Sequence, residues 1–301
     1  MKAVLLHGYG GVEQLQYEDA PEPNLASDGV IVRVISTSIN PVDYKLRSGA
    51  MKGAVHLNFP TVLGRDVAGE VTGLGAGVRK FKVGDKVMGL VRNSYAEYLS
   101  AQADALTSIP DGLDPLDAGV LPLVALTGAQ LIETGVQPSS GELVLVTGAA
   151  GSVGRTAVFV ARQHGAKVIA GVRAAQKGDA QSLGADSVVA LDDDKETDAL
   201  PELDAIADTI DGETLSKLLP KLKKSGRLAS VLGQPEAAKK AGVNVNAVFA
   251  QPDPNRLYKL AEDVRDGRLK IPIAKRMRLS EIREAQAEAE KGINGKIAII
   301  P

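Results

Sequence analysis

The residues best suited to chemistry gather in a short glycine-rich turn that follows an apolar run. Leu143 to Thr147 is apolar and flanked by glycines, a pattern typical of a strand buried in a parallel sheet. After the turn, Arg155 to Gln163 carries apolar residues at helical spacing. Such a turn brings backbone N–H groups and the positive end of a helix dipole to a pyrophosphate. We assign to this phosphate-binding turn Ala149, Ala150, Gly151, Ser152, Val153 and Gly154.

The turn departs from the dinucleotide fingerprint, which places glycine at 149, 151 and 154, because position 149 is alanine. Taken alone, the pattern is equally compatible with an ordinary turn between a strand and a helix. Lys167 to Gly171 supplies a second strand after Gly165, which is typical of a helix end. The resulting strand, helix and strand favour a dinucleotide-binding unit.

The end of the second strand indicates which dinucleotide binds. An NAD-specific site has an acidic residue there for the ribose 2′-hydroxyl, whereas this chain has Gly171-Val172-Arg173 and no carboxylate before Asp179. Arg173 and Lys177 are suited to a 2′-phosphate, which a guanidinium binds with two parallel hydrogen bonds. We therefore predict NADPH as the cofactor. The alternative is that both residues are solvated charges on a loop.

The composition excludes several classes of protein. The chain has 301 residues, 44% hydrophobic and 24% charged, as expected for two globular domains. Its net charge of -2 argues against nucleic acid or an anionic membrane as a partner. No cysteine and three scattered histidines predict that no metal is bound. Without an export signal or a long apolar segment, we expect a cytoplasmic protein, and a homodimer.

The elements that position these residues differ between the two parts of the chain. Up to about residue 120, short apolar runs alternate with turns rich in Gly, Pro, Asn and Asp, which predicts a small antiparallel barrel. Gly73, Gly75 and Gly77 resemble a nucleotide motif, but no apolar helix follows them, so we interpret them as barrel turns. From Glu142 strands and helices alternate, which predicts a doubly wound parallel α/β sheet. We place the barrel-like catalytic domain at 1–123 with 268–301, and the Rossmann dinucleotide-binding domain at 124–267.

Several motifs together resemble one known family along nearly the whole chain. They are Asn40-Pro41 with Asp43, Arg47 and Gly49; Phe59-Pro60, Gly64, Asp66 and Gly69; Phe81 to Val87; Tyr95-Ala96-Glu97-Tyr98; Leu121-Pro122 with Leu126-Thr127; the turn at 149–154; and Gly295-Lys296. In this order they resemble the zinc-free quinone oxidoreductase branch of the medium-chain dehydrogenase/reductase superfamily. The resemblance implies a GroES-like β-barrel catalytic domain that also takes back the C-terminal segment, and NADPH-dependent reduction of a quinone or of an alkene conjugated to a carbonyl.

Departures from the zinc-dependent members bear on the mechanism. Those members place a ligand cysteine near position 40 and Gly-His-Glu near 64, where this chain has Asn40 and Gly64-Arg65-Asp66. Alcohol oxidation on a metal is therefore excluded. The catalytic candidates are Asn40, whose amide can orient the nicotinamide or the substrate carbonyl, and Tyr44, whose phenol can act as an acid. The alternatives are that Asn40-Pro41 only turns the chain and that Tyr44 only packs.

The other cofactor candidates are spread over the chain. Asp43 and Arg47 have the spacing of a helical ion pair and are expected to order their segment rather than react. Thr209, Leu232 and Gly233 follow predicted strands, where a doubly wound sheet binds its ligand. The full set of predicted cofactor contacts outside the turn is Thr127, Gly171, Arg173, Lys177, Thr209, Leu232, Gly233, Phe249, Ala250, Gly295 and Lys296, several of them implied by the resemblance.

The predicted function is hydride transfer from NADPH to a quinone or an α,β-unsaturated carbonyl compound without a metal. Two alternatives remain open from the sequence. One is an enoyl thioester reductase, which performs the same hydride step on another carrier. The other is a non-enzymatic interaction protein that retains a cofactor, because a fold alone does not determine function.

Overall fold

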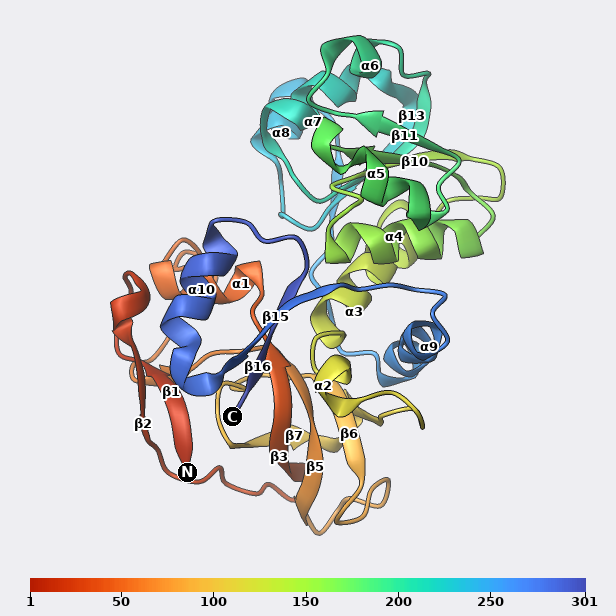
Figure 1. Cartoon of the computed structure of the whole chain (residues 1–301). Helices are drawn as coiled ribbons and strands as arrows, with labels where there is room; N and C mark the ends of the chain where they lie inside the picture. The colour runs from red at the N-terminus through yellow and green to blue at the C-terminus, as the bar shows by residue number, and fades with distance from the viewer. The chain divides into compact units, whose positions relative to one another are not determined.

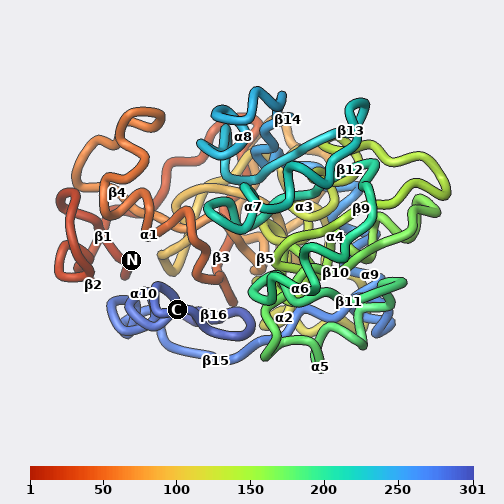
Figure 2. Tube along the Cα trace, turned by 90° about the horizontal axis from the view of Figure 1, so that it is seen from above, coloured from red at the N-terminus to blue at the C-terminus, as the bar shows by residue number.

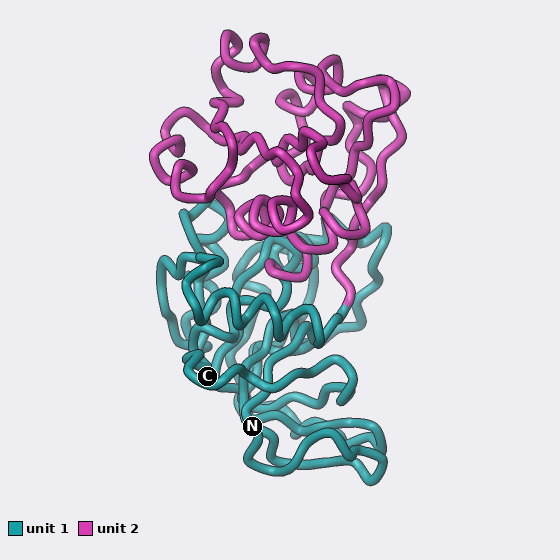
Figure 3. The backbone as a smooth tube through the Cα atoms, turned by 90° about the vertical axis from the view of Figure 1, so that its right-hand side faces the viewer, with its two compact units in different colours: residues 1–123, 252–301 teal, residues 124–251 magenta.

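The computed structural model describes all residues, 1–301. It divides into two compact units, which Figure 3 colours separately. Unit 1 comprises 1–123 and 252–301, and unit 2 comprises 124–251. The second boundary differs from the predicted one because the helix α9 (Pro254–Arg265) contacts β8 (Leu106–Ser108) and so belongs with unit 1.

Unit 1 is built from largely antiparallel sheets, as predicted for a barrel-like domain, and only β15 and β16 pair in parallel. A sheet of order β15-β16-β3-β5-β6-β8, with β7 also paired to β3, lies beside a small sheet of order β2-β1-β4. Its strands not yet given are β1 (Lys2–Leu6), β2 (Leu15–Asp19), β3 (Gly29–Ser38), β4 (Thr61–Val62), β5 (Asp66–Leu74), β6 (Lys86–Leu90), β7 (Tyr98–Gln102), β15 (Ile273–Arg278) and β16 (Lys296–Ile300). Its other helices are α1 (Pro41–Ser48), α2 (Pro115–Ala118) and α10 (Ile282–Glu290).

The C-terminal segment completes unit 1. Figure 2 shows the last strand, β16, beside β3, although nearly the whole chain separates them. Figure 1 shows α10 next to α1 on the same unit, where the two helices are in contact. β16 has four fully or nearly fully buried residues, and each buried Leu or Ile side chain contributes roughly 1.5–3 kcal/mol. The fold of unit 1 therefore depends on the end of the chain, as the family resemblance implied.

Gly75 and Gly77 are barrel turns, as interpreted from the sequence, whereas Gly73 lies within the strand β5 and not in a turn. A Cβ at position 75 would lie 2.1 Å from the Ala26 carbonyl oxygen. The Gly75 and Gly77 N–H groups donate to the Gly29 and Ser27 carbonyls. These glycines thus allow two backbone segments to approach closely, and no helix follows them.

Unit 2 is a six-stranded parallel sheet of order β11-β10-β9-β12-β13-β14. This order reverses direction between β9 and β12, which confirms the doubly wound α/β fold and locates its ligand-binding edge at the carboxyl ends of those strands. The strands are β9 (Leu143–Thr147), β10 (Lys167–Val172), β11 (Ser187–Ala190), β12 (Leu203–Asp208), β13 (Leu222–Ser230) and β14 (Val245–Ala247).

Helices cover this sheet. α4 packs against β9 and β10, and α7 packs beside α8. The helices are α3 (Pro122–Gln130), continued by a π-helical turn at Leu131–Val136, then α4 (Ser152–Gln163), α5 (Lys177–Ala180), α6 (Asp194–Asp198), α7 (Gly212–Leu218) and α8 (Glu236–Ala241). None of the helices in either unit has the length and apolar character needed to cross a lipid bilayer.

Candidate active site

The predicted phosphate-binding turn lies between β9 and α4, at the carboxyl end of a central strand. Gly151 is the N-cap of α4, and no side chain caps the helix. The first helical bond runs from the Arg155 N–H to the Gly151 carbonyl at 2.8 Å. The N–H groups of Ser152, Val153 and Gly154 therefore have no acceptor in the protein. Free amides at the positive end of a helix dipole suit an anion such as a pyrophosphate.

Packing explains which positions of the turn require glycine. A Cβ on Gly154 would lie 2.3 Å from the Gly148 carbonyl oxygen, so α4 can approach the turn only without a side chain there. At Gly151 the nearest atom to such a Cβ would be the same oxygen, at 3.3 Å. Ala149 replaces the first glycine of the fingerprint, and its methyl group is fully buried. The fingerprint is therefore degenerate only at a position where the interior has room for a methyl group.

Arg155 supports the turn, a role that was not predicted from the sequence. Its side chain is 7% exposed, and its Nε donates to the Ala150 carbonyl at 2.8 Å. Burial lowers the pKa of Arg155 from its usual value. An arginine as the fourth residue of a helix that follows a glycine-rich turn is the only sequence signal for this contact.

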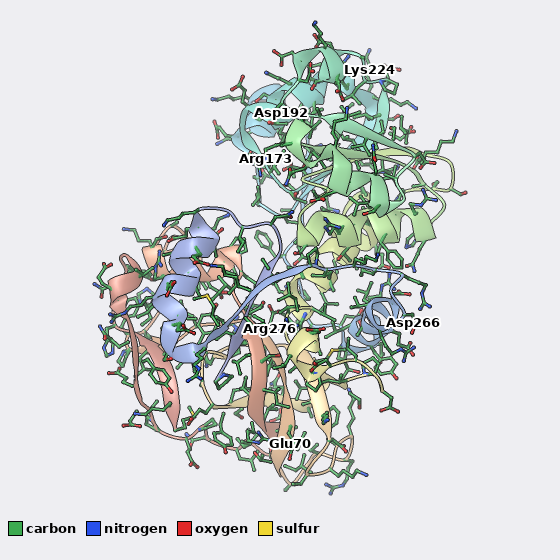
Figure 4. The ribbon with its side chains drawn as sticks, viewed as in Figure 1. Glu70, Arg173, Asp192, Lys224, Asp266 and Arg276 are labelled. Atoms are coloured by element: carbon green, nitrogen blue, oxygen red, sulfur yellow. The ribbon has the colours of Figure 1, made fainter.

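Arg173 and Lys177 differ in how freely they can meet a ligand. Arg173 follows β10 and is exposed, with one contact from its Nε to Gln176 Oε1 at 3.4 Å. Lys177 Nζ donates to both carboxylate oxygens of Glu196, at 2.7 and 2.9 Å. Asp192, at the end of the neighbouring strand β11, accepts from the Ala174 N–H and so supports the Arg173 loop (Figure 4). Of the two predicted cations, only Arg173 has terminal nitrogens free for a phosphate.

Polar residues end three neighbouring strands of unit 2, and the buried carboxylate of one of them, Asp208, joins the other two. Asp208 is fully buried and accepts from Thr147 Oγ1 at 3.0 Å and from Ser230 Oγ at 2.9 Å. The predicted residue Thr209 is held beside them, because its Oγ1 donates to the Thr147 carbonyl at 2.7 Å. Asp208 was not predicted, although a polar residue at the end of each of three apolar strands is a readable signal.

Apolar side chains protrude at the same edge of unit 2. Ile210, Leu232 and Phe249 are 42%, 37% and 61% exposed. A Cβ on Gly233 would lie 3.8 Å from the Phe249 ring, so the predicted residues of 232–233 and 249–250 come together. Large exposed apolar groups at the carboxyl ends of a parallel sheet are typical of a ligand site. Gly171 and Thr127 are buried near the turn: Gly171 accepts from the Ala149 N–H, and α3, which carries Thr127, packs through Gly128 against the start of α4.

The catalytic candidates belong to a buried polar cluster in unit 1. The cluster consists of Ser38, Asn40, Asp43, Asp66, Tyr95 and Lys296, each at most 5% exposed. Asn40 donates from Nδ2 to Asp66 Oδ2 at 2.7 Å and accepts at Oδ1 from Lys296 Nζ at 2.5 Å. Both amide atoms of Asn40 thus have partners in the protein, and its catalytic contact stays a prediction.

Asp43 and Tyr95 form the second half of the cluster. Asp43 Oδ2 accepts from the Asn40 N–H at 2.8 Å and from the Tyr95 hydroxyl at 2.7 Å. The other oxygen, Oδ1, is buried without a partner. Burial raises the pKa of the Asp43 carboxyl to about 6, against the opposing effect of these hydrogen bonds. The same burial raises the pKa of Tyr95 well above its usual value.

The expected ion pair between Asp43 and Arg47 is wrong. Arg47 turns away and donates to Gln286 Oε1 at 3.1 Å and to Glu290 Oε1 at 2.6 Å, which fastens α1 to α10. Asp43 instead caps the start of α1. The helical spacing of the two residues did not determine their partners. Asp43 accepts from Tyr95, and Arg47 donates to Gln286 and Glu290, all of which lie far along the chain.

Tyr44 is the catalytic candidate with a free polar group. It is half-buried against the apolar core of unit 1, and its hydroxyl makes no hydrogen bond to the protein. Burial raises the pKa of the Tyr44 phenol, and the nearby carboxylates of Glu290 and Asp43 raise it further. The phenol is therefore protonated at neutral pH and can donate a hydrogen bond or a proton.

The donor set of this cluster does not fit a metal ion. Asn40 and Arg65 stand where zinc-dependent relatives place ligands, and Arg65 Nε donates to the Val91 carbonyl at 2.9 Å. The Lys296 ammonium already occupies the cluster, 2.5 Å from Asn40 Oδ1 and 4.0 Å from Asp66 Oδ2. A divalent cation at this place would be repelled by it. No three metal-ligating side chains come together elsewhere in the chain.

Comparisons with known proteins agree with this geometry. Residues 26–111 match the alcohol dehydrogenase GroES-like domain, and residues 183–299 match the zinc-binding dehydrogenase family. The chloroplast envelope quinone oxidoreductase homolog of Arabidopsis thaliana is 28% identical over 100% of this chain and 98% of its own. The chloroplastic NADPH-dependent alkenal/one oxidoreductase of the same plant is 32% identical over 77% of this chain and 63% of its own.

A solved structure extends the comparison. The quinone oxidoreductase from Coxiella burnetii superimposes with a TM-score of 0.89 and 28% identity, covering 100% of this chain and 99% of that one. The predicted cytoplasmic location is contradicted by these comparisons, because several of the matched relatives are named as chloroplast proteins.

Proposed function

The chain belongs to the medium-chain dehydrogenase/reductase superfamily, in its zinc-free quinone oxidoreductase branch, and we propose that it is an NADPH-dependent reductase of quinones or of alkenes conjugated to a carbonyl. Membership confirms the resemblance read from the motifs and identifies the protein as an oxidoreductase that uses a nicotinamide dinucleotide. A non-enzymatic interaction protein is therefore no longer an alternative. The choice of NADPH over NADH and the substrate class are the parts that we propose.

The cofactor proposal rests on the positive charge that follows β10. An exposed guanidinium, Arg173, follows the strand directly, and its terminal nitrogens have no partner in the protein. The free amides of Ser152, Val153 and Gly154 lie at the start of α4 in the same unit. Amides at a helix start suit a pyrophosphate, and a guanidinium suits a ribose phosphate. The naming of one relative as NADPH-dependent supports the same choice.

The chain's own residues account for the remaining needs of the reaction. Bound NADPH supplies the hydride. Reduction of a conjugated alkene builds negative charge on the carbonyl oxygen, which needs a donor. Tyr44 is the candidate, because its hydroxyl is free and its raised pKa keeps it protonated. The exposed apolar side chains of Ile210, Leu232 and Phe249 would exclude water from a bound nicotinamide. The remaining predicted contacts, Ala250, Gly233 and Gly295, stay predictions, as does the homodimer.

A panel of acceptors tests this proposal. NADPH oxidation is followed with quinones, short-chain enones and enoyl thioesters, each with and without prior chelation of metals. We expect turnover with enones or quinones that survives chelation, because no residue set holds a metal. Turnover with enoyl thioesters alone would assign the chain to the alternative reductase class, and loss of activity restored by zinc would show that the cluster was misread.

A further inference from the structure

Lys296 carries a charge into the interior of unit 1. It is the first residue of β16 and is 5% exposed. Its Nζ donates to the Ile39 carbonyl at 2.8 Å and to Asn40 Oδ1 at 2.5 Å. Buried ammonium groups are rare unless their donors are paired. Lys296 is therefore not an ordinary surface lysine, and its buried partners indicate its role.

The contacts of Lys296 leave little capacity for a cofactor, which is the role that the family resemblance implied. Two of its three protons are used by Ile39 and Asn40. The nearest carboxylate oxygen, Asp66 Oδ2, lies at 4.0 Å. The ammonium thus lies among the Ile39 carbonyl, which follows β3, the Asn40 amide at the start of α1 and the Asp66 carboxylate of β5. Its partners are all protein atoms.

Asn40 is the residue on which these partners converge. Its carbonyl oxygen is held by Lys296, its amide nitrogen by Asp66, and its backbone N–H by Asp43. The two side-chain contacts have opposite polarity, so the amide cannot flip without losing both. Asn40 is also the N-cap of α1, the helix that carries Tyr44 one turn later. Fixing Asn40 therefore fixes the start of the helix that presents the free phenol.

We propose that Lys296 and Asp66 are positioning residues which clamp the Asn40 amide from both ends and thereby set the place of Tyr44. In this arrangement an ammonium group of the chain contacts Asn40, one of the two residues at positions where zinc-dependent relatives hold a metal ligand. The expected effect on turnover rests on the proposed function. The clamp, meaning the two contacts of Lys296 and Asp66 with the Asn40 amide, is independent of that function, because it is a property of the folded chain.

The clamp has a further anchor in Asp66. Its Oδ2 accepts from Asn40 and from Ser38 Oγ, and its Oδ1 accepts from the Leu123 N–H at 2.6 Å. Both carboxylate oxygens thus accept hydrogen bonds, and the residue is fully buried. Removal of the Lys296 charge would leave this carboxylate without its counter-charge, which is costly inside a protein. Removal of both charges would not create that imbalance.

A double-mutant cycle tests the clamp. Lys296→Met, Asp66→Asn and the double variant are compared with the wild type in thermal unfolding and in kcat and KM with an acceptor from the panel. The control is Lys275→Met on the adjacent strand β15, where the lysine is 48% exposed and pairs with Glu288 at the surface. We expect Lys296→Met to lower Tm by several degrees and kcat at least about tenfold. The KM for NADPH should change less than about threefold, because the Lys296 ammonium is engaged by the Ile39 carbonyl and Asn40 Oδ1.

The coupling between the two residues decides the inference. We expect the losses of the two single variants not to multiply, so that the double variant lies within about threefold of the worse single variant. Folding of the double variant where Lys296→Met does not fold would support the clamp directly. A double variant that also fails to fold, losses that multiply, or a Lys296→Met enzyme with wild-type kcat and Tm would overturn it. If no acceptor is reduced by the wild type, the proposed function fails, and the unfolding half of the cycle still decides the clamp.

Discussion

Glu196 holds Lys177 with both carboxylate oxygens, whereas no protein atom contacts the terminal nitrogens of Arg173. The two basic residues that the sequence offered as equal phosphate ligands are therefore unequal. A lysine already paired must give up its carboxylate to bind a phosphate, while the guanidinium has only a weak contact to lose.

Arg173→Ala should weaken NADPH binding at least about fivefold and leave NADH binding nearly unchanged, because only NADPH carries the 2′-phosphate. Lys177→Ala should have a smaller effect, since its ammonium is engaged by Glu196. The comparison uses dissociation constants of both nucleotides, with the exposed Lys224→Ala variant as a matched control (Figure 4). Equal affinities of the wild type for the two nucleotides would refute the assignment.

Gly151→Ala separates ligand approach from packing. A Cβ at 151 would lie 3.3 Å from the Gly148 oxygen and the backbone φ of -75° suits alanine, so stability should change by less than about 1 kcal/mol. Cofactor binding should weaken at least about tenfold if the pyrophosphate approaches this backbone closely. Gly154→Ala, whose Cβ would lie 2.3 Å from the same oxygen, should lose stability as well. A Gly151→Ala protein that binds NADPH normally would exclude the turn as the phosphate site.

The β9, α4 and β10 unit was predictable because its pattern is local. The apolar run, the small-residue turn and the helical spacing lie within one short stretch, and the structure reproduces their order. β14 and β15 were not predicted. The sequence of β15 is Ile-Ala-Lys-Arg-Met-Arg, in which three charged residues hide the alternation that predicts a half-buried strand. The strand tolerates these charges because it lies at the edge of its sheet and pairs only with β16.

The polar cluster could not be predicted from spacing. Lys296 and Asn40 are 256 residues apart, and Arg47 and Gln286 are 239 apart. The motifs named most of these residues but not their partners, since a buried carboxylate takes whichever donor the fold brings to it. The same reason explains why Asp43 pairs with Tyr95 rather than with the arginine four residues later.

Asp43 should make stability depend on pH. Its pKa is about 6 in the folded protein and 3.8 without the fold. The folded state thus binds the proton more tightly, and this contribution to stability is lost as pH rises from about 4 through 6. The loss amounts to about 3 kcal/mol for a shift of roughly two units. Asp43→Asn is neutral throughout, so its free energy of unfolding relative to the wild type should increase over this range.

Urea unfolding of both proteins at about pH 4.5 and pH 7.5 checks this sign. The unpartnered Asp43 Oδ1 makes the substitution tolerable, because an amide there breaks no existing contact. A relative stability that stays constant, or that falls as pH rises, would mean that Asp43 is ionised without penalty in the folded protein.

Tyr44→Phe should reduce kcat by about tenfold to a hundredfold. Its hydroxyl bonds to no protein atom, so Tm should stay within about 2 °C of the wild type. Steady-state kinetics with the best acceptor of the panel and a thermal melt measure both quantities. A full-rate Tyr44→Phe enzyme would transfer the donor role to water, and a large fall in Tm would indicate that the hydroxyl makes a structural contact.

The position of deuterium in the reduced product tests the hydride assignment most directly. The enzyme is supplied with an enone and with NADPH that carries deuterium on the transferable position of the nicotinamide, and the product is analysed by NMR; a second reaction uses unlabelled NADPH in deuterated water. We expect the cofactor label at the β-carbon and the solvent label at the α-carbon, because hydride adds to the carbon distant from the carbonyl and the enolate is protonated afterwards. Solvent deuterium at the β-carbon, with none transferred from NADPH, would contradict hydride transfer to a conjugated alkene.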